Sequence, residues 1–99
     1  MQYEVVLKIE ADEELEKLSN RERILVFKQF KKIASSPELG KLLGNKAGYD
    51  LSGCRKMYAD RKRIRIVYMV LDEQIVIEVI AIGKRDEMEV YRSASERLT

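Results

Sequence analysis

The chain has 99 residues, 45% of them hydrophobic, which fits one globular domain with a single modest core. It has no histidine and one cysteine, Cys54. These counts exclude an internal disulfide and any mechanism that uses an imidazole as base or metal ligand. The sequence shows no signal-peptide pattern and no apolar run of about 20 residues, so we expect a cytoplasmic protein with no membrane association.

Positive charge is concentrated in one short stretch, although the net charge of the whole chain is only +2. Residues 54–65 contain a single acidic side chain, Asp60, and six basic ones. The basic residues are Arg55, Lys56, Arg61, Lys62, Arg63 and Arg65. A local excess of this kind attracts a polyanionic partner whatever the total charge is.

The first predicted elements are a strand and two helices. Apolar side chains alternate with polar ones over residues 3–9, which predicts a strand. A short helix follows over residues 13–18, with Asp12 as its N-cap. Ser19 and Glu22 have the spacing of a capping box, so a longer helix begins there and ends before the only proline. The two helices are expected to form an antiparallel hairpin.

The second half of the chain is dominated by strands. Residues 37–53, rich in glycine and leucine, are interpreted as an irregular connection. Three strands are predicted over residues 54–59, 62–71 and 74–82, joined by very short turns and therefore antiparallel. Gly83 is expected to break the last strand, and a final helix is expected to begin at Asp86.

The element order predicts an α+β fold in a single domain, residues 1–99. An N-terminal strand and the helical hairpin precede a three-stranded antiparallel meander that completes one sheet, and a C-terminal helix follows. We expect the helices to lie largely on one face of the sheet.

Basic and aromatic side chains share one face of two predicted strands. Arg63 and Arg65 alternate on one strand, and Lys56 and Tyr58 alternate on the strand before it. Cations of this kind contact RNA phosphates, and a phenol ring can stack on an unpaired base. The alternative is a solvated sheet face, or an edge strand kept polar against aggregation.

Two further candidates lie near the C-terminus. Lys84 and Arg85 follow Gly83 at the junction between a strand and a helix, where basic groups can bind a phosphate. The alternative is a plain turn without a ligand. Tyr91 lies on the last predicted helix, where a tyrosine at helical spacing is more often a core residue than a catalytic one.

Six segments of the sequence form a pattern that resembles the RelE family of bacterial type II toxin–antitoxin systems, within the RelE/ParE superfamily. They are Leu51-Ser52-Gly53, Arg55-Lys56-Met57-Tyr58, Ile64-Arg65-Ile66-Val67-Tyr68, Ala81-Ile82-Gly83-Lys84-Arg85, Glu89-Val90-Tyr91 and Glu96-Arg97-Leu98. The resemblance extends over nearly the whole chain and implies a microbial RNase-type fold.

The resemblance also implies roles for individual residues in ribosome-dependent cleavage of messenger RNA in the A site. Arg65 corresponds to the arginine that contacts the scissile phosphate. Arg85 corresponds to the one that stabilises the transition state or protonates the leaving group, and Tyr91 to a tyrosine that orients the substrate and its 2′-hydroxyl. Lys56 matches one of the family's two lysines, whereas Tyr58 occupies the position of the other, which is a departure from the family pattern.

A site of this composition is chemically sufficient for RNA cleavage by attack of the 2′-hydroxyl on the adjacent phosphate. The reaction needs alignment, proton transfer and relief of negative charge, and arginine stays protonated throughout. Lys56 is a candidate general base or hydrogen-bond partner, and with Tyr58 in place of a lysine either Arg61, Lys62 or Arg63 supplies the missing cation or the activity is altered. We expect no metal and no cofactor. The RNA-binding residues are expected to be Arg55, Tyr58, Arg61, Lys62, Arg63 and Lys84. The implied partners are the ribosome, messenger RNA and a cognate antitoxin that forms a hetero-oligomer with the toxin.

Two other functions fit the same sequence. A ParE-like toxin would inhibit DNA gyrase by protein binding, without nuclease chemistry. A catalytically inactive homologue would only bind RNA or protein, and Tyr58 in place of a lysine keeps that interpretation open.

Overall fold

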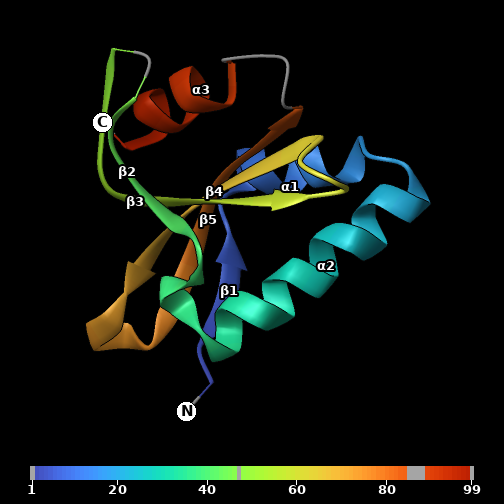
Figure 1. The fold of residues 1–99 in the computed structure, drawn as a ribbon, viewed down its shortest axis with the longest axis horizontal. Coiled ribbons are helices and arrows are strands. Elements are labelled where there is room, and N and C mark those ends of the chain that lie inside the picture. Colours follow the sequence, from blue (N-terminus) through green and yellow to red (C-terminus); the bar gives the residue numbers. More distant parts are fainter. Residues whose placement is uncertain (1, 47, 85–88, 99) are drawn as a thin grey trace.

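The computed structural model describes residues 2–46, 48–84 and 89–98. Five strands and three α-helices, with two short 3-10 helices, make up this part of the chain (Figure 1). In chain order they are β1 (Glu4–Leu7), α1 (Ile9–Glu16), α2 (Asn20–Ser35), η1 (Pro37–Leu39), β2 (Lys41–Lys46), β3 (Tyr49–Ala59), β4 (Ile64–Leu71), η2 (Asp72–Gln74), β5 (Val76–Lys84) and α3 (Glu89–Leu98). None of the helices in the described residues is long and apolar enough to span a membrane.

The strands form one mixed sheet in the order β1-β5-β4-β3-β2. The predicted antiparallel meander is confirmed, because β4 pairs with both β3 and β5 in antiparallel register. The first strand, β1, runs parallel to β5 and is followed by α1 and α2. The α+β class predicted from the order of elements is therefore confirmed.

Both faces of the sheet are covered, each by a different set of helices. The predicted helical hairpin packs on one face, where Val26 and Phe30 of α2 meet Ile66 of β4. The opposite face lies under α3, where Val67 of β4 meets Val90. The expectation that the helices lie largely on one face was wrong for α3. The apolar residues that follow Arg65 on its face of β4 are the reason, because they need a cover of their own.

A bulge in β5 increases the apolar area under α3. Val67 pairs with Ala81 and Tyr68 with Val79, so Ile80 is an additional residue in the ladder. Ile80 and Ala81 both belong to the buried cluster beneath α3. The bulge therefore presents two successive β5 side chains to this helix.

Residues 37–53 are not an irregular connection as expected. They form β2 and the first part of β3, which pair as an antiparallel hairpin from Lys41 opposite Lys56 to Lys46 opposite Tyr49. The ladder is interrupted between Leu42 and Gly44, and Gly44 has a φ of +59°. Glycine adopts that left-handed conformation without strain, so a glycine assigned to an irregular connection instead accommodates an irregularity within a strand.

Two element boundaries also differ from the prediction. Helix α1 begins at Ile9 with Lys8 as N-cap, so Asp12 lies inside the first turn, where its charge favours the helix dipole. Strand β5 continues through Gly83, which pairs with Arg65. A Cβ atom on Gly83 would lie 3.0 Å from the Cβ of Val90, so this glycine permits close packing of α3. The predicted cap at Asp86 lies outside the described residues.

The predicted capping box at the start of α2 is confirmed. The Glu22 amide donates to Ser19 Oγ (3.2 Å), and the Ser19 amide donates to Glu22 Oε1 (2.9 Å). Lys84, at the end of β5, forms an ion pair with the same carboxylate. The hydrogen bond from Lys84, together with that from the Ser19 amide, lowers the pKa of Glu22 from 4.5 to about 2. These contacts fix the first turn of α2 to the end of the sheet.

The Glu22–Lys84 contact should make stability depend on pH. Glutamine preserves the capping box, so Glu22→Gln removes mainly the charge. We expect a loss at pH 7 of up to about 1 kcal/mol, the range for partly exposed ion pairs. Because the folded-state pKa of Glu22 is lowered, its contribution is present above pH 4.5 and lost as the pH falls to about 2.

Urea unfolding of both proteins at pH 7 and near pH 2 measures this difference. Glu13→Gln, at an exposed position of α1, is the matched control and should change stability little at either pH. A difference between Glu22→Gln and the wild type that persists unchanged at the lower pH would contradict the assignment.

The buried hydroxyl of Tyr68 anchors the β2–β3 hairpin to the centre of the sheet. It donates to the Pro37 carbonyl and accepts from the Gly40 amide, each at 2.8 Å. A Cβ on Gly40 would collide with the Tyr68 hydroxyl and lie 2.7 Å from the Lys56 carbonyl oxygen. Glycine is therefore required here by the close approach of the chain to Tyr68.

Tyr68→Phe is expected to destabilise the protein by about 1–3 kcal/mol, because it leaves the Gly40 amide and the Pro37 carbonyl without their partner. Tyr3→Phe is the control. It removes a phenol hydrogen bond to Asp72 at an exposed position and should cost clearly less than Tyr68→Phe. Chemical denaturation of the two variants gives the comparison, and equal losses would contradict the anchoring role of Tyr68.

Candidate functional site

Three of the predicted site residues share one face of the sheet. Tyr58 of β3 pairs directly with Arg65 of β4, and Lys56 pairs with Val67. Val67 is buried under α3, and side chains two residues apart on a strand point to the same face. Lys56, Tyr58 and Arg65 therefore lie together on the side of the sheet that α3 covers in part.

The phenol of Tyr58 is surrounded by cations. Lys56 Nζ donates a hydrogen bond to the Tyr58 hydroxyl (3.0 Å) and lies 5.0 Å from the ring centre. Lys62 Nζ lies 6.0 Å from the same ring centre. The hydrogen bond from Lys56, with a smaller effect of Arg65, lowers the pKa of Tyr58 below its ordinary value of 10.0. Tyr58 therefore releases its proton more readily than an ordinary tyrosine.

Tyr91 of α3 is packed against Arg65. The guanidinium carbon lies 5.1 Å from the Tyr91 ring centre, and Lys46 Nζ from β2 lies 5.9 Å from it. The side chain is fully buried, and its hydroxyl has no hydrogen-bond partner among residues 2–46, 48–84 and 89–98. The structure thus brings Tyr91 to Arg65, with its ring against the cation and its hydroxyl shielded from solvent.

The other predicted site residues are more dispersed. Arg55 points to the opposite face and donates to the carbonyls of Gly40 (2.7 Å) and Glu38 (3.1 Å). Lys84 is paired with Glu22. Arg61, Lys62 and Arg63 are exposed in the turn between β3 and β4. Arg85 lies outside the described residues.

The β3–β4 turn has an unusual backbone. Asp60, Arg61 and Lys62 have φ values of +52°, +54° and +71°, in the left-handed region that non-glycine residues seldom adopt. Asp60 is buried and accepts hydrogen bonds from both terminal nitrogens of Arg21 in α2 (2.9 and 3.3 Å). Arg21 also lowers the pKa of Asp60. This pair holds the turn, and with it Lys62, in a fixed position.

Two residues near the site, Arg21 and Lys46, were not predicted from the sequence. Arg21 acts on a turn 39 residues later, and Lys46 belongs to a strand that was interpreted as a loop. Neither residue is part of a local motif, so no pattern in the sequence could have assigned them to the site.

The chain matches a known toxin family over most of its length. The sequence model described as "ParE toxin of type II toxin-antitoxin system, parDE" matches residues 5–89. A RelE-like toxin protein of Escherichia coli is 36% identical, over 99% of both chains. This chain belongs to the RelE family. The mRNA interferase toxin RelE of E. coli is 34% identical to it, over 86% of this chain and 85% of the relative.

Solved structures of RelE agree with the fold. A mutant of E. coli RelE in the free state has a TM-score of 0.81 at 32% identity, covering 100% of both chains. The mutant in complex with a peptide of the antitoxin RelB has a TM-score of 0.73 at 31% identity, covering 95% of both chains. The RelE fold therefore extends over the whole of this family member.

The interaction of Lys56 with Tyr58 in this RelE-family toxin can be tested by titration. Lys56→Met removes the hydrogen bond and the charge, so the pKa of Tyr58 should rise towards or above its ordinary value. An NMR titration of ring-labelled tyrosine measures the shift, and Tyr58→Phe assigns the signal. Tyr3 is the internal control, because its pKa is raised by a hydrogen bond to Asp72 and should not respond. An unchanged Tyr58 titration would contradict the contact.

Proposed function

We propose that this toxin is a ribosome-dependent endoribonuclease that cleaves messenger RNA in the A site. The 2′-hydroxyl attacks the adjacent phosphate and gives a 2′,3′-cyclic phosphate, or the 3′-phosphate after hydrolysis, and a 5′-hydroxyl. The observation that carries the proposal is the convergence of Lys56, Tyr58 and Arg65 on one sheet face, with Tyr91 against Arg65. The name of the relative, mRNA interferase, supports the same activity.

Arg65 is proposed to bind the scissile phosphate. Its guanidinium stays protonated at any working pH and can donate two hydrogen bonds to phosphate oxygens. Negative charge accumulates on those oxygens as the 2′-oxygen attacks, so a fixed cation favours the transition state over the ground state. Arg85 is proposed as a second cation for the transition state or the leaving group.

Lys56 and Tyr58 are proposed to transfer the proton. Lys56 was one candidate for the general base, and Tyr58 is a second candidate, because its hydroxyl oxygen lies 3.0 Å from Lys56 Nζ. The lowered pKa favours the phenolate form of Tyr58, which can accept the proton of the 2′-hydroxyl and become a neutral phenol, while the Lys56 ammonium donates a hydrogen bond to the phenolate oxygen. In this chain Tyr58 would thus supply an acid–base group in place of the permanent charge of a second lysine.

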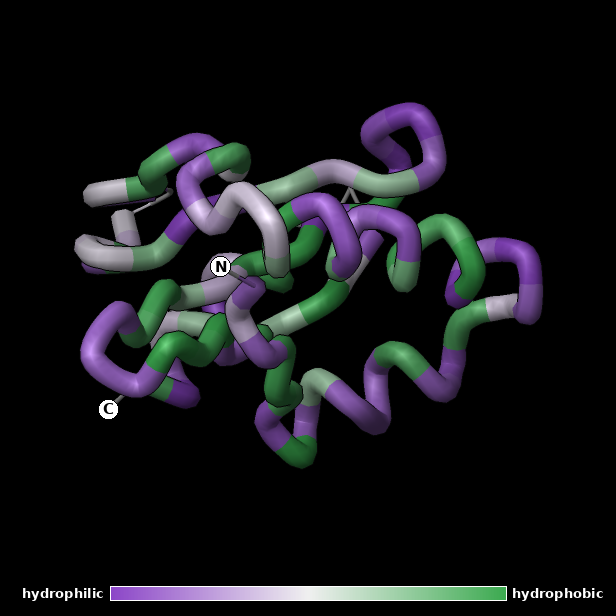
Figure 2. Tube along the Cα trace, turned by 90° about the horizontal axis from the view of Figure 1, so that it is seen from below, coloured by the Kyte–Doolittle hydropathy of each residue, from purple (hydrophilic) through white to green (hydrophobic). Residues whose placement is uncertain are grey.

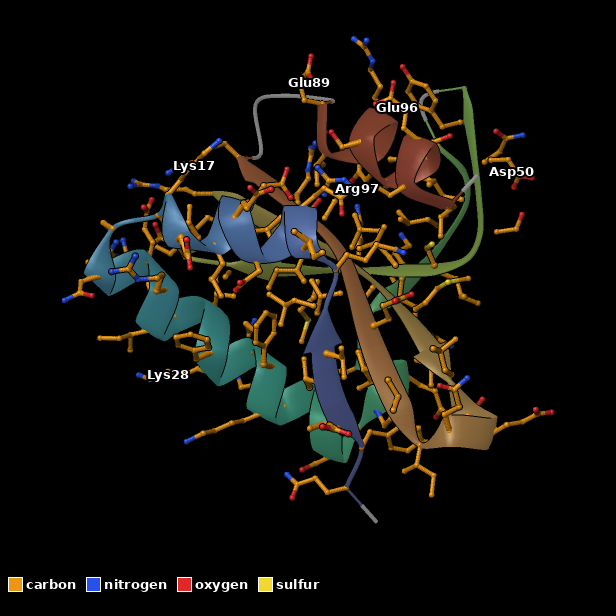
Figure 3. All side chains as sticks on the ribbon, turned by 180° about the vertical axis from the view of Figure 1, so that it is seen from behind. Lys17, Lys28, Asp50, Glu89, Glu96 and Arg97 are labelled. Atoms are coloured by element: carbon orange, nitrogen blue, oxygen red, sulfur yellow. The ribbon has the colours of Figure 1, made fainter. Side chains whose placement is uncertain are left out.

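Tyr91 is proposed to orient Arg65 in the conformation described here. Its ring lies against the guanidinium, and its hydroxyl is buried. For the hydroxyl to reach a substrate 2′-oxygen, α3 must shift. The C-terminal end of α3 is fixed by Arg97, which binds the Glu14 carboxylate of α1 and the Ile80 carbonyl, each at 2.8 Å (Figure 3). A shift of α3 would have to break or bend these contacts.

A cognate antitoxin is the proposed partner that neutralises the toxin. E. coli RelE is known in an intact complex with its antitoxin and in complex with an antitoxin peptide. We expect an amphipathic antitoxin helix to pack on this domain and either cover the basic face or displace α3. A complex in which the antitoxin lies far from residues 54–65 and 83–98 would contradict this expectation.

The catalytic assignment predicts a large loss on removal of Arg65. Arg65→Ala should lower cleavage of a translated message by about 100-fold or more, the usual effect of removing one group that stabilises the transition state. Tyr91→Phe keeps the ring that lies against Arg65 and should retain both the fold and cleavage near the wild-type level; a loss of cleavage would show instead that the hydroxyl reaches the substrate. Purified ribosomes programmed with one message, followed by primer extension, give the readout.

The control for this experiment is Arg92→Ala. It removes an arginine that is exposed on α3 and that forms, among the described residues, one long ion pair with Glu96 at 3.7 Å. Cleavage by this variant should equal that of the wild type. Full activity of Arg65→Ala, with its fold verified by circular dichroism, would overturn the site.

The alternative, inhibition of DNA gyrase, is favoured by one observation, which is the ParE name of the matching family model. A supercoiling assay with purified gyrase separates the two functions. Inhibition of gyrase without cleavage of messages would favour the ParE-like activity. Unaffected growth on expression without an antitoxin would instead indicate the inactive homologue.

A further inference from the structure

A second basic site lies beside the candidate catalytic face, between α2 and the β3–β4 turn. A groove of about 460 Å³ opens there. Its lining includes two apolar side chains, and cationic side chains are contributed by both the helix and the turn. The lining residues include Leu25, Lys28, Lys32, Ala59, Arg61 and Lys62.

The charge of the groove suits an anionic ligand. Its only carboxylate among the described residues is that of Asp60, which is already engaged by Arg21. Lys28 and Lys32 lie one turn apart on α2, are exposed, and have no carboxylate partner in the part of the chain that the structure describes. Figure 3 shows Lys28 projecting outward from the helix. These cations add to one another because nothing nearby neutralises them.

The groove is also continuous with the catalytic face. Lys62 lines the groove, and its Nζ lies 6.0 Å from the centre of the Tyr58 ring on that face. The β2–β3 ladder ends at the Lys41–Lys56 pair, so the last residues of β3 have no strand partner on this side among the described residues. An extended ligand can therefore pass around the open end of β3 from Tyr58 into the groove.

The wall of the groove is rigid on the side of the turn. Asp60, Arg61 and Lys62 are held in left-handed conformations, and Arg21 fixes the buried Asp60 carboxylate. A wall that is ordered before binding does not have to lose conformational freedom on binding, which favours affinity for a flexible ligand. The structure thus presents a preformed basic groove.

We propose that this groove binds the substrate RNA strand next to the nucleotide that is cleaved. Lys28 and Lys32 contact backbone phosphates, and the apolar floor of Leu25 and Ala59 takes a ribose or base. A basic groove that follows the backbone, with an aromatic side chain at one end, is a common arrangement for single-stranded nucleic acid. The identity of the strand as substrate rests on the proposed function, whereas binding of RNA in the groove does not.

The test measures binding of a labelled nine-nucleotide 2′-O-methyl RNA, which cannot be cleaved, to the full chain over a series of salt concentrations. The double variant Lys28→Ala/Lys32→Ala should bind about tenfold more weakly at low salt. The slope of log affinity against log salt should become shallower by about 0.7 for each phosphate that the variant no longer neutralises. Lys31→Ala is the control, because it removes a positive charge from the same helix at a position that does not line the groove. It should leave the slope unchanged.

Three results would overturn the proposal. The first is an unchanged affinity and slope in the double variant. The second is an equal weakening in Lys31→Ala, which would show only a general effect of charge. The third is unchanged RNA binding with weaker binding of poly-glutamate or of ribosomes without message, which would assign the groove to an acidic polypeptide or to ribosomal RNA.

The cleavage assay separates this proposal from the proposed function. If the wild type does not cleave translated messages but the double variant loses salt-dependent RNA binding, the nuclease function is wrong and the groove still binds RNA. If the wild type cleaves and the double variant binds and cleaves equally well, the nuclease stands and the groove proposal fails.

Discussion

The pairing of Tyr58 with Arg65 across β3 and β4 determines the position of every group at the candidate site. Side chains alternate between the two faces of a sheet, so a shift of one residue in this register would send the whole set to the other face. Contacts with other segments of the chain stabilise this register. Tyr68, on the face of β4 that α1 and α2 cover, hydrogen-bonds to η1 and to Gly40. Asp60, next to the end of β3, is bound by Arg21.

Aromatic rings lie against the cations of the site. Lys56 and Lys62 lie against the ring of Tyr58, and Arg65 and Lys46 lie against that of Tyr91. An aromatic face attracts a cation through its quadrupole while carrying no net charge. Aromatic rings can therefore order basic side chains and leave their positive charge available to a phosphate, whereas a carboxylate would neutralise the charge and repel the RNA.

The features that were predictable from the sequence are those encoded by neighbouring residues. The capping box at Ser19 and Glu22, the alternation in β4 and the short turns of the meander each depend on a few adjacent positions, and all are present in the structure. Figure 2 shows the same local signal in α2, where hydrophobic and hydrophilic segments alternate along the helix. The motif residues Lys56, Tyr58 and Arg65 could be placed on one face because both strands were predicted.

What the sequence could not provide depends on contacts between distant segments. Gly44 accommodates an irregularity within β2, and Gly40, just before that strand, is required by the close approach of Tyr68. Neither reason is visible from residues 37–53 alone. The close packing of α3 on its face of the sheet depends on the bulge at Ile80 and on the space beside Gly83. The contact of Lys46 with Tyr91 depends both on the pairing of β2 and on the position of α3.

The parallel pairing of β1 with β5 has a consequence for synthesis of the protein. Glu4 pairs with Val76, so the first strand has no partner until β5 has left the ribosome. Contacts between such distant segments form late, after most of the chain has been translated. A truncated or unfinished chain that ends before β5 therefore cannot form the complete sheet. Translation must therefore reach the end of β5 at Lys84 before all five strands can pair.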